Sequence, residues 1–186
     1  MTALCSYGWV FFFYVLSAAT MCFAADNITH VQDSLPCADV DVIAQTYCIS
    51  SIDFETQCIK QQIRIVDKRL GKSKNIAIAG HLVKKPSIKL RRVLDAFVTD
   101  WACLKSTKGI NYVLLFYTCS PGDERGYCAQ GYKQWDSLFN LDGVELTGHA
   151  RHKDARRKRL ERKLGLREMF ANGIGLQGLD YLGVKK

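Results

Sequence analysis

Residues 86–109 read PSIKLRRVLDAFVTDWACLKSTKG, and this stretch carries the clearest secondary-structure pattern in the chain. Its apolar residues recur every three or four positions, as they do on one face of an α-helix; they are Leu90, Val93, Leu94, Phe97, Val98, Trp101 and Leu104. Pro86 suits the first turn of a helix and Gly109 suits its end. The stretch predicts an amphipathic helix, and it sets our expectation for the fold class.

Two earlier segments show the same spacing of apolar residues. In residues 34–48, Ser34 and Pro36 suit a helix start. Apolar side chains follow at helical intervals; they are Cys37, Val40, Ile43, Tyr47 and Cys48. Residues 54–70 form a second apolar stripe, and Gly71 is a natural stop. Both segments predict amphipathic helices.

The segment after Gly109 has a weaker pattern. Residues 110–119 are almost continuously apolar or aromatic, so that a buried strand and a buried helix are hard to separate. The helical neighbours favour a helix there, and residues 128–139 predict a last short one. We therefore expect a mainly α fold: a small disulfide-stapled helical domain followed by a cysteine-free basic tail.

The N-terminus has the features of a secretory signal. An apolar run extends from Trp9 to Leu16, and Cys22-Phe23-Ala24 offers small residues at the two positions that determine cleavage. The run is short for a membrane span. One feature departs from the usual signal-peptide pattern, since no Lys or Arg precedes the run. We expect residues 1–24 to be a signal peptide and the mature chain to be secreted into an oxidising, extracellular compartment.

Six cysteines follow the expected signal peptide: Cys37, Cys48, Cys58, Cys103, Cys119 and Cys128. An even number in a secreted chain predicts three disulfides, with about 15 possible connectivities. On one helix Cys37 and Cys48 would lie roughly 16 Å apart, too far to pair. Among the alternatives we favour Cys48–Cys58 and Cys119–Cys128 as local staples, which leaves Cys37 to reach Cys103.

Charge and cysteines are segregated along the chain. The formal net charge is +8, yet residues 25–148 hold 15 basic and 14 acidic residues, while residues 149–186 hold 11 basic and 4 acidic ones. This division predicts a six-cysteine domain over 25–148 and a separable basic tail over 149–186.

The tail contains a tetrabasic motif at Arg156-Arg157-Lys158-Arg159. Processing proteases of the furin type read such paired basic residues, and cleavage after Arg159 would release the rest of the tail without a disulfide tether. The alternative interpretation is a solvated basic helix face that no protease unfolds.

The same region has the composition of a surface that binds anions. Arg151, Lys153, Arg162 and Lys163 join the tetrabasic motif, with few apolar residues between them. Such segments bind anionic polysaccharide or lipid by charge; nucleic acid is not an expected partner of a secreted protein. A flexible, soluble tail is the alternative. Asn27 begins the sequon Asn-Ile-Thr and is a candidate glycosylation site.

No sequence motif indicates catalysis, and we expect neither enzymatic activity nor a cofactor or metal. His149 and His152 lie three apart, but no cysteine accompanies them. The layout of signal, stapled body and basic appendage is similar to that of venom and salivary proteins and of peptide prohormones. We expect a toxin-like or effector-like secreted protein that binds an extracellular protein or receptor. A processed prohormone-like precursor and a cationic antimicrobial or polysaccharide-binding protein are the alternatives.

Overall fold

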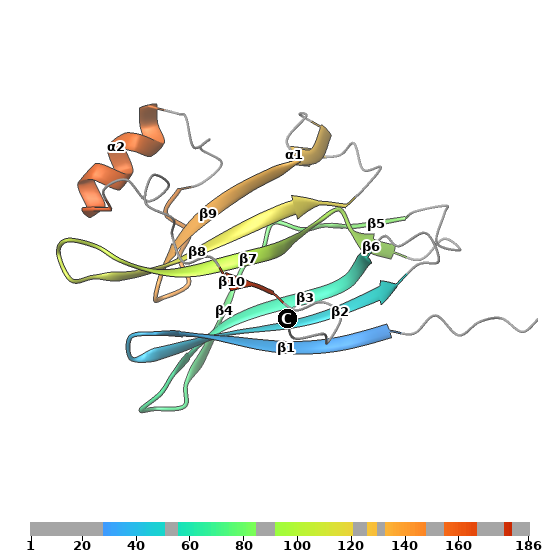
Figure 1. The fold of residues 1–186 in the computed structure, drawn as a ribbon, viewed down its shortest axis with the longest axis horizontal. Coiled ribbons are helices and arrows are strands. Elements are labelled where there is room, and N and C mark those ends of the chain that lie inside the picture. Colours follow the sequence, from blue (N-terminus) through green and yellow to red (C-terminus); the bar gives the residue numbers. More distant parts are fainter. Residues whose placement is uncertain are drawn as a thin grey trace, which may run out of the picture.

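Two four-stranded antiparallel sheets, packed face to face, form the body of the protein (Figure 1). The structure is a computed structural model that describes residues 28–50, 56–84, 92–120, 126–129, 133–147, 155–166 and 177–179. The first sheet has the order β1 (Ile28–Cys37), β2 (Val40–Ser50), β3 (Thr56–Asp67) and β4 (Ser73–Ile76). The second has the order β10 (Gln177–Gly178), β7 (Ala96–Lys105), β8 (Asn111–Cys119) and β9 (Gln134–Asn140).

Shorter elements complete the described chain. Strands β5 (Leu82–Lys84) and β6 (Arg92–Leu94) pair as a small ribbon of their own. Helix α1 (Gly126–Ala129) is one turn long, and helix α2 (Ala155–Leu164) lies outside the second sheet (Figure 1). The chain therefore forms three layers, with one sheet outermost, one sheet central and α2 on its far side.

The expected mainly α fold is wrong, because the segments interpreted as helices are strands. From Val40 to Cys48 in β2, the buried side chains alternate with more exposed neighbours; they are Val40, Val42, Ala44, Thr46 and Cys48. This is the period of two that places one face of a strand against a core. The helical interpretation relied on Ile43 and Tyr47, which belong to the less buried set.

The helix predicted over residues 86–109 is wrong for a more specific reason. Strand β7 has a register irregularity between Val98 and Asp100, where it pairs with β8. The extra residue brings Val98 and Trp101, three positions apart, to the same core cluster. A bulged strand thus imitates helical spacing; Pro86 and Leu90, which supported the helix, lie outside the described residues.

The helix predicted over residues 110–119 is wrong because this segment is strand β8, which is buried on both faces. One face packs between the sheets, where the main core gathers Val42, Ile63, Ile65, Val98, Trp101, Val113, Leu115, Tyr117 and Phe139 with other residues. The other face packs beneath α2, in a second cluster with Ala102, Leu104, Tyr112, Leu114, Leu138 and Leu166. A strand covered on both sides shows an unbroken apolar run and no clear period.

The three disulfides that we favoured are confirmed, although the helical reasoning behind them is not. Cys37–Cys103 joins the end of β1 to β7 across the two sheets, with 5.4 Å between the Cα atoms. Cys48 and Cys58 are register partners on β2 and β3, and Cys119–Cys128 ties the end of β8 to α1. The bridges therefore fix both the pairing within a sheet and the packing between sheets.

A buried glutamine provides a further link between the sheets. The side-chain amide of Gln61 on β3 donates to the Val98 carbonyl at 2.9 Å, and its oxygen accepts the Val98 N–H at 2.7 Å. The Gln61 amide therefore bonds both backbone groups of Val98, as a neighbouring strand would, at the register irregularity of β7.

We predict that Gln61→Ala lowers the free energy of unfolding by about 1–3 kcal/mol, because two buried backbone groups lose this partner. Gln62→Ala is the matched control, since Gln62 bonds Asn75 on the exposed face of the sheet. That change should stay within about 0.5 kcal/mol. Chemical denaturation of both variants measures the difference, and equal effects would contradict the role of Gln61.

Candidate functional site

The basic tail contributes a helix that is anchored to the second sheet by a buried ion pair. Arg157 on α2 is fully buried, and its Nη2 lies 2.7 Å from Oδ2 of Asp136, which is 2% exposed. Its Nε donates to Oε1 of Glu161, one turn along the same helix, also at 2.7 Å. The guanidinium thus bridges a strand carboxylate and a helix carboxylate and fixes how α2 is rotated on the sheet.

This ion pair changes the meaning of the tetrabasic motif. Arg156, Lys158 and Arg159 are exposed, whereas Arg157 between them is buried against β9. A protease that reads an extended substrate needs α2 to unwind and Arg157 to leave Asp136. Cleavage after Arg159 remains a prediction, and in this fold it requires release of the helix first.

The C-terminal end of α2 is fixed equally firmly. Gly165 has φ +77°, its N–H donates to the Arg162 carbonyl, and the Leu166 N–H donates to the Glu161 carbonyl. This is the Schellman cap, which favours glycine. Side chains other than glycine would also meet Thr107, because a Cβ built on Gly165 lies 2.5 Å from the Thr107 hydroxyl. The helix end is therefore pressed against the turn between β7 and β8.

Hydrogen bonds join the same two segments. The Thr107 N–H donates to the Gly165 carbonyl at 3.0 Å, and Lys108 Nζ donates to the Lys163 carbonyl at 2.9 Å. Lys108 thus donates to a carbonyl at the negative end of the helix dipole. Its ammonium group adds a positive charge from the β7–β8 turn to the basic surface.

The solvent side of α2 is uniformly cationic. Its exposed basic side chains, which we call the α2 cationic face, are Arg156, Lys158, Arg159, Arg162 and Lys163. The only acidic residue between 155 and 164 is Glu161, whose carboxylate is bound by Arg157. Two of the four residues that we assigned to anion binding, Arg162 and Lys163, belong to this face; Arg151 and Lys153 lie outside the described residues.

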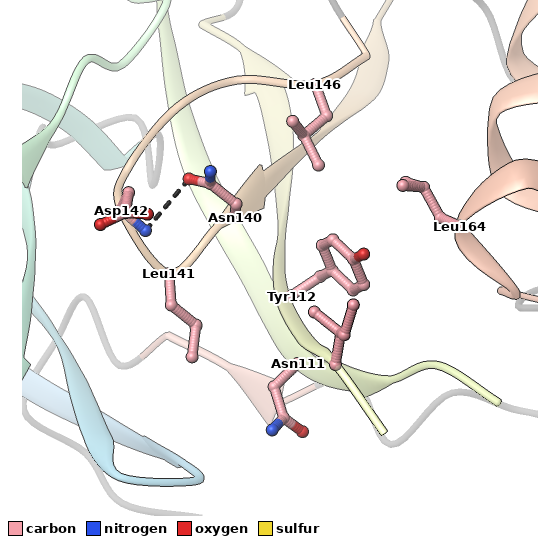
Figure 2. Close-up of a pocket in the computed structure, with 8 residues that line it drawn as sticks. Asn111, Tyr112, Asn140, Leu141, Asp142, Leu146 and Leu164 are labelled. Atoms are coloured by element: carbon pink, nitrogen blue, oxygen red, sulfur yellow. Dashed lines mark hydrogen bonds between the residues drawn. The ribbon is translucent and has the colours of Figure 1, made fainter. Parts of the chain in front are cut away.

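A pocket of about 400 Å³ lies where the C-terminal end of α2 meets the sheet (Figure 2). Its lining comes from three segments: Ile110 with the start of β8, the end of β9 with the loop that follows it, and Leu164 of α2. The lining residues are Ile110, Asn111, Tyr112, Asn140, Leu141, Asp142, Leu146 and Leu164. Asn140 shapes the loop, because its side-chain oxygen accepts the N–H groups of Asp142 and Val144.

One tyrosine in the sandwich has a strongly perturbed pKa but does not form part of this pocket. Burial raises the pKa of the Tyr117 phenol far above its usual range, and the nearby charge of Glu145 adds to the effect. The ring stacks on Trp135 with centroids 5.1 Å apart. Tyr117 therefore stays protonated and belongs to the core.

Sequence analysis missed Asp136 and the pocket. A weak signal for Asp136 was present, since an acid that follows Trp135 and precedes Leu138 and Phe139 needs a partner if the segment is buried. The pocket had no such signal, because its residues come from separate segments. Within the described ranges no group of three or more His, Cys, Asp or Glu side chains is arranged to hold a metal ion. Asn27, His149 and His152 lie outside those ranges.

Comparisons with known proteins add no relative: no protein family, curated protein or solved structure matches this chain. The three disulfides are typical of an oxidising, extracellular-type environment. Neither described helix has the length and apolar character needed to cross a bilayer. The site must therefore be interpreted from its own chemistry.

We predict that Arg157→Met lowers the free energy of unfolding by about 3–5 kcal/mol, because Asp136 loses its buried counter-ion. Adding Asp136→Leu should restore much of that loss, since the buried charge is then removed as well. Lys158→Met, an exposed neighbour, should change stability by less than about 0.5 kcal/mol. Thermal and chemical unfolding measure all three, and equal losses for Arg157→Met and Lys158→Met would contradict the anchoring role of Arg157.

Proposed function

We propose that this protein is secreted and acts by binding an extracellular target without catalysing a reaction. We further propose that the α2 cationic face is its contact surface and that the target is a linear anionic polysaccharide. The observation that carries the proposal is the buried Arg157–Asp136 pair, which holds α2 in one orientation with its other basic side chains outward.

A fixed helix binds a charged polymer at lower cost than a flexible tail. Because α2 is packed on the sheet and capped at Gly165, its backbone loses little freedom when a ligand binds. Glu161, the carboxylate within α2, is bound by the buried Arg157 and not by the exposed cations of the helix. The face is therefore preorganised for negative charge.

The arrangement of the cations suits an extended polyanion. Arg156, Arg159 and Lys163 recur at intervals of three and four residues, which forms one stripe about 10 Å long on the helix. Lys158 and Arg162 form a second stripe beside it. Repeated sulfate or carboxylate groups of a polysaccharide can each meet one of these side chains.

Anionic lipid is a less suitable target for the same face. A helix that lies in a membrane surface inserts an apolar face between the lipids. In α2 the apolar side chains are turned toward the protein: Leu160 is half-buried, and Leu164 packs against the cluster beneath the helix. The surface that remains offers charge without an apolar face to insert.

The expected extracellular location agrees with this target. The apolar N-terminal segment predicts secretion, and the disulfides suit the oxidising environment in which sulfated polysaccharides are found. The described residues offer a preformed charged surface, and an extracellular binding role requires nothing more.

We predict that the protein binds heparin and that Lys158→Glu/Arg162→Glu lowers the affinity at least tenfold. The matched control is Lys84→Glu/Arg92→Glu, which makes the same change in net charge at exposed positions on β5 and β6. Affinity of the unaltered protein should fall steeply between 0.05 and 0.3 M salt (roughly the range over which screening becomes strong). Calorimetry or surface plasmon resonance measures both effects.

Equal losses for the two double variants would show that net charge alone attracts heparin, and they would overturn the assignment to α2. Binding to anionic vesicles at least as tight as binding to heparin would overturn the choice of polysaccharide. Circular dichroism of each variant establishes that the sandwich is intact before the affinities are compared.

A further inference from the structure

We propose that the pocket at the C-terminal end of α2 is a second binding site, and that its ligand is a free anionic amphiphile with a single hydrocarbon chain, such as a fatty acid. This inference is independent of the polysaccharide proposal, since it concerns the cavity beside the helix and not the helix face.

The cavity has the composition of a small-molecule site. Five of its eight lining residues are apolar or aromatic: Ile110, Tyr112, Leu141, Leu146 and Leu164. The three others, Asn111, Asn140 and Asp142, bring polar groups to the lining. Its volume of about 400 Å³ lies within the range of roughly 300–1,000 Å³ that is usual for ligand pockets.

The mouth of the cavity exposes apolar surface that a ligand would cover. Ile110 in the lining is 51% exposed, and Val144 on the adjoining loop is 55% exposed. Covering such side chains is favourable by about 25 cal/mol for each Å² removed from water. A hydrocarbon chain lying over Ile110, Leu146 and Leu164 would cover the mouth in this way.

A cation beside the cavity favours an anionic head group. The Lys163 carbonyl directly precedes the lining residue Leu164 and accepts a hydrogen bond from Lys108 Nζ at 2.9 Å. The Lys108 ammonium group is therefore held at the α2 side of the cavity. A carboxylate at the end of the hydrocarbon chain would gain from this charge, whereas a neutral head group would not.

Two acidic groups nearby are matched by cations. Asp142 in the lining is 2.6 Å from Lys74 Nζ, and Glu161 binds Arg157. Glu145, on the loop that follows β9, is exposed to solvent, where water and salt screen its charge. The Lys108 ammonium group is therefore the cation that an anionic head group meets at the α2 side of the cavity.

The test uses the full mature chain and sodium dodecanoate below its micelle concentration, followed by calorimetry. We expect binding to the unaltered protein and at least a tenfold loss of affinity in Ile110→Glu, which places a negative charge at the mouth. Leu82→Glu is the matched control, because Leu82 on β5 is 52% exposed and receives the same charge. Its affinity should stay within twofold of the unaltered protein.

A second comparison tests the head group. Lys108→Gln should weaken dodecanoate at least threefold and leave dodecanol unchanged, since only the anion meets the ammonium group. Absence of dodecanoate binding, equal losses in Ile110→Glu and Leu82→Glu, or association only with anionic vesicles would each overturn the proposal. Heparin binding of Ile110→Glu, measured in parallel, separates this outcome from failure of the polysaccharide proposal.

Discussion

The buried pair of Arg157 and Asp136 is the interaction on which the outer layer of this protein depends. It takes a cation from the most basic segment of the chain and places it on the central sheet. Burying two charges is costly, and a pair of this kind contributes less to stability than its geometry suggests. Its effect is orientation: α2 can sit on the sheet in one rotation only, and that rotation turns five basic side chains outward.

The same interaction explains why the second sheet is buried on both faces. The first sheet covers one face, with Cys37–Cys103 and the Gln61–Val98 hydrogen bonds between them. Helix α2 covers part of the other face, where Leu138 and Leu166 pack together. Strand β10, which also comes from the basic tail, extends the sheet beside β7. The described parts of the tail are thus built into the sandwich.

Local sequence patterns predicted the cross-links but not the fold. Two of the favoured pairs rest on short separations, which hold for strands as well as for helices, and the third pair is what they leave over. Cys48 and Cys58, for example, meet across the connection between two strands as they would between two helices. The fold class failed at β7 and β8, where a bulge and two-sided burial erase the period of two. The alternation in β2 was present in the sequence, and a test of both periods would have favoured a strand there.

The candidate sites were predictable only in part, for a related reason. The cations of α2 are contiguous in sequence, so their charge was apparent, but their orientation depends on a partner 21 residues away on β9. The pocket depends on three segments brought together by the fold, and its residues carry no common motif. Lys163 connects the two sites: its side chain belongs to the α2 cationic face, and its carbonyl holds the Lys108 ammonium group beside the pocket. Anions bound at the two sites would repel one another across this helix end, and by linkage each would weaken the binding of the other to the same degree.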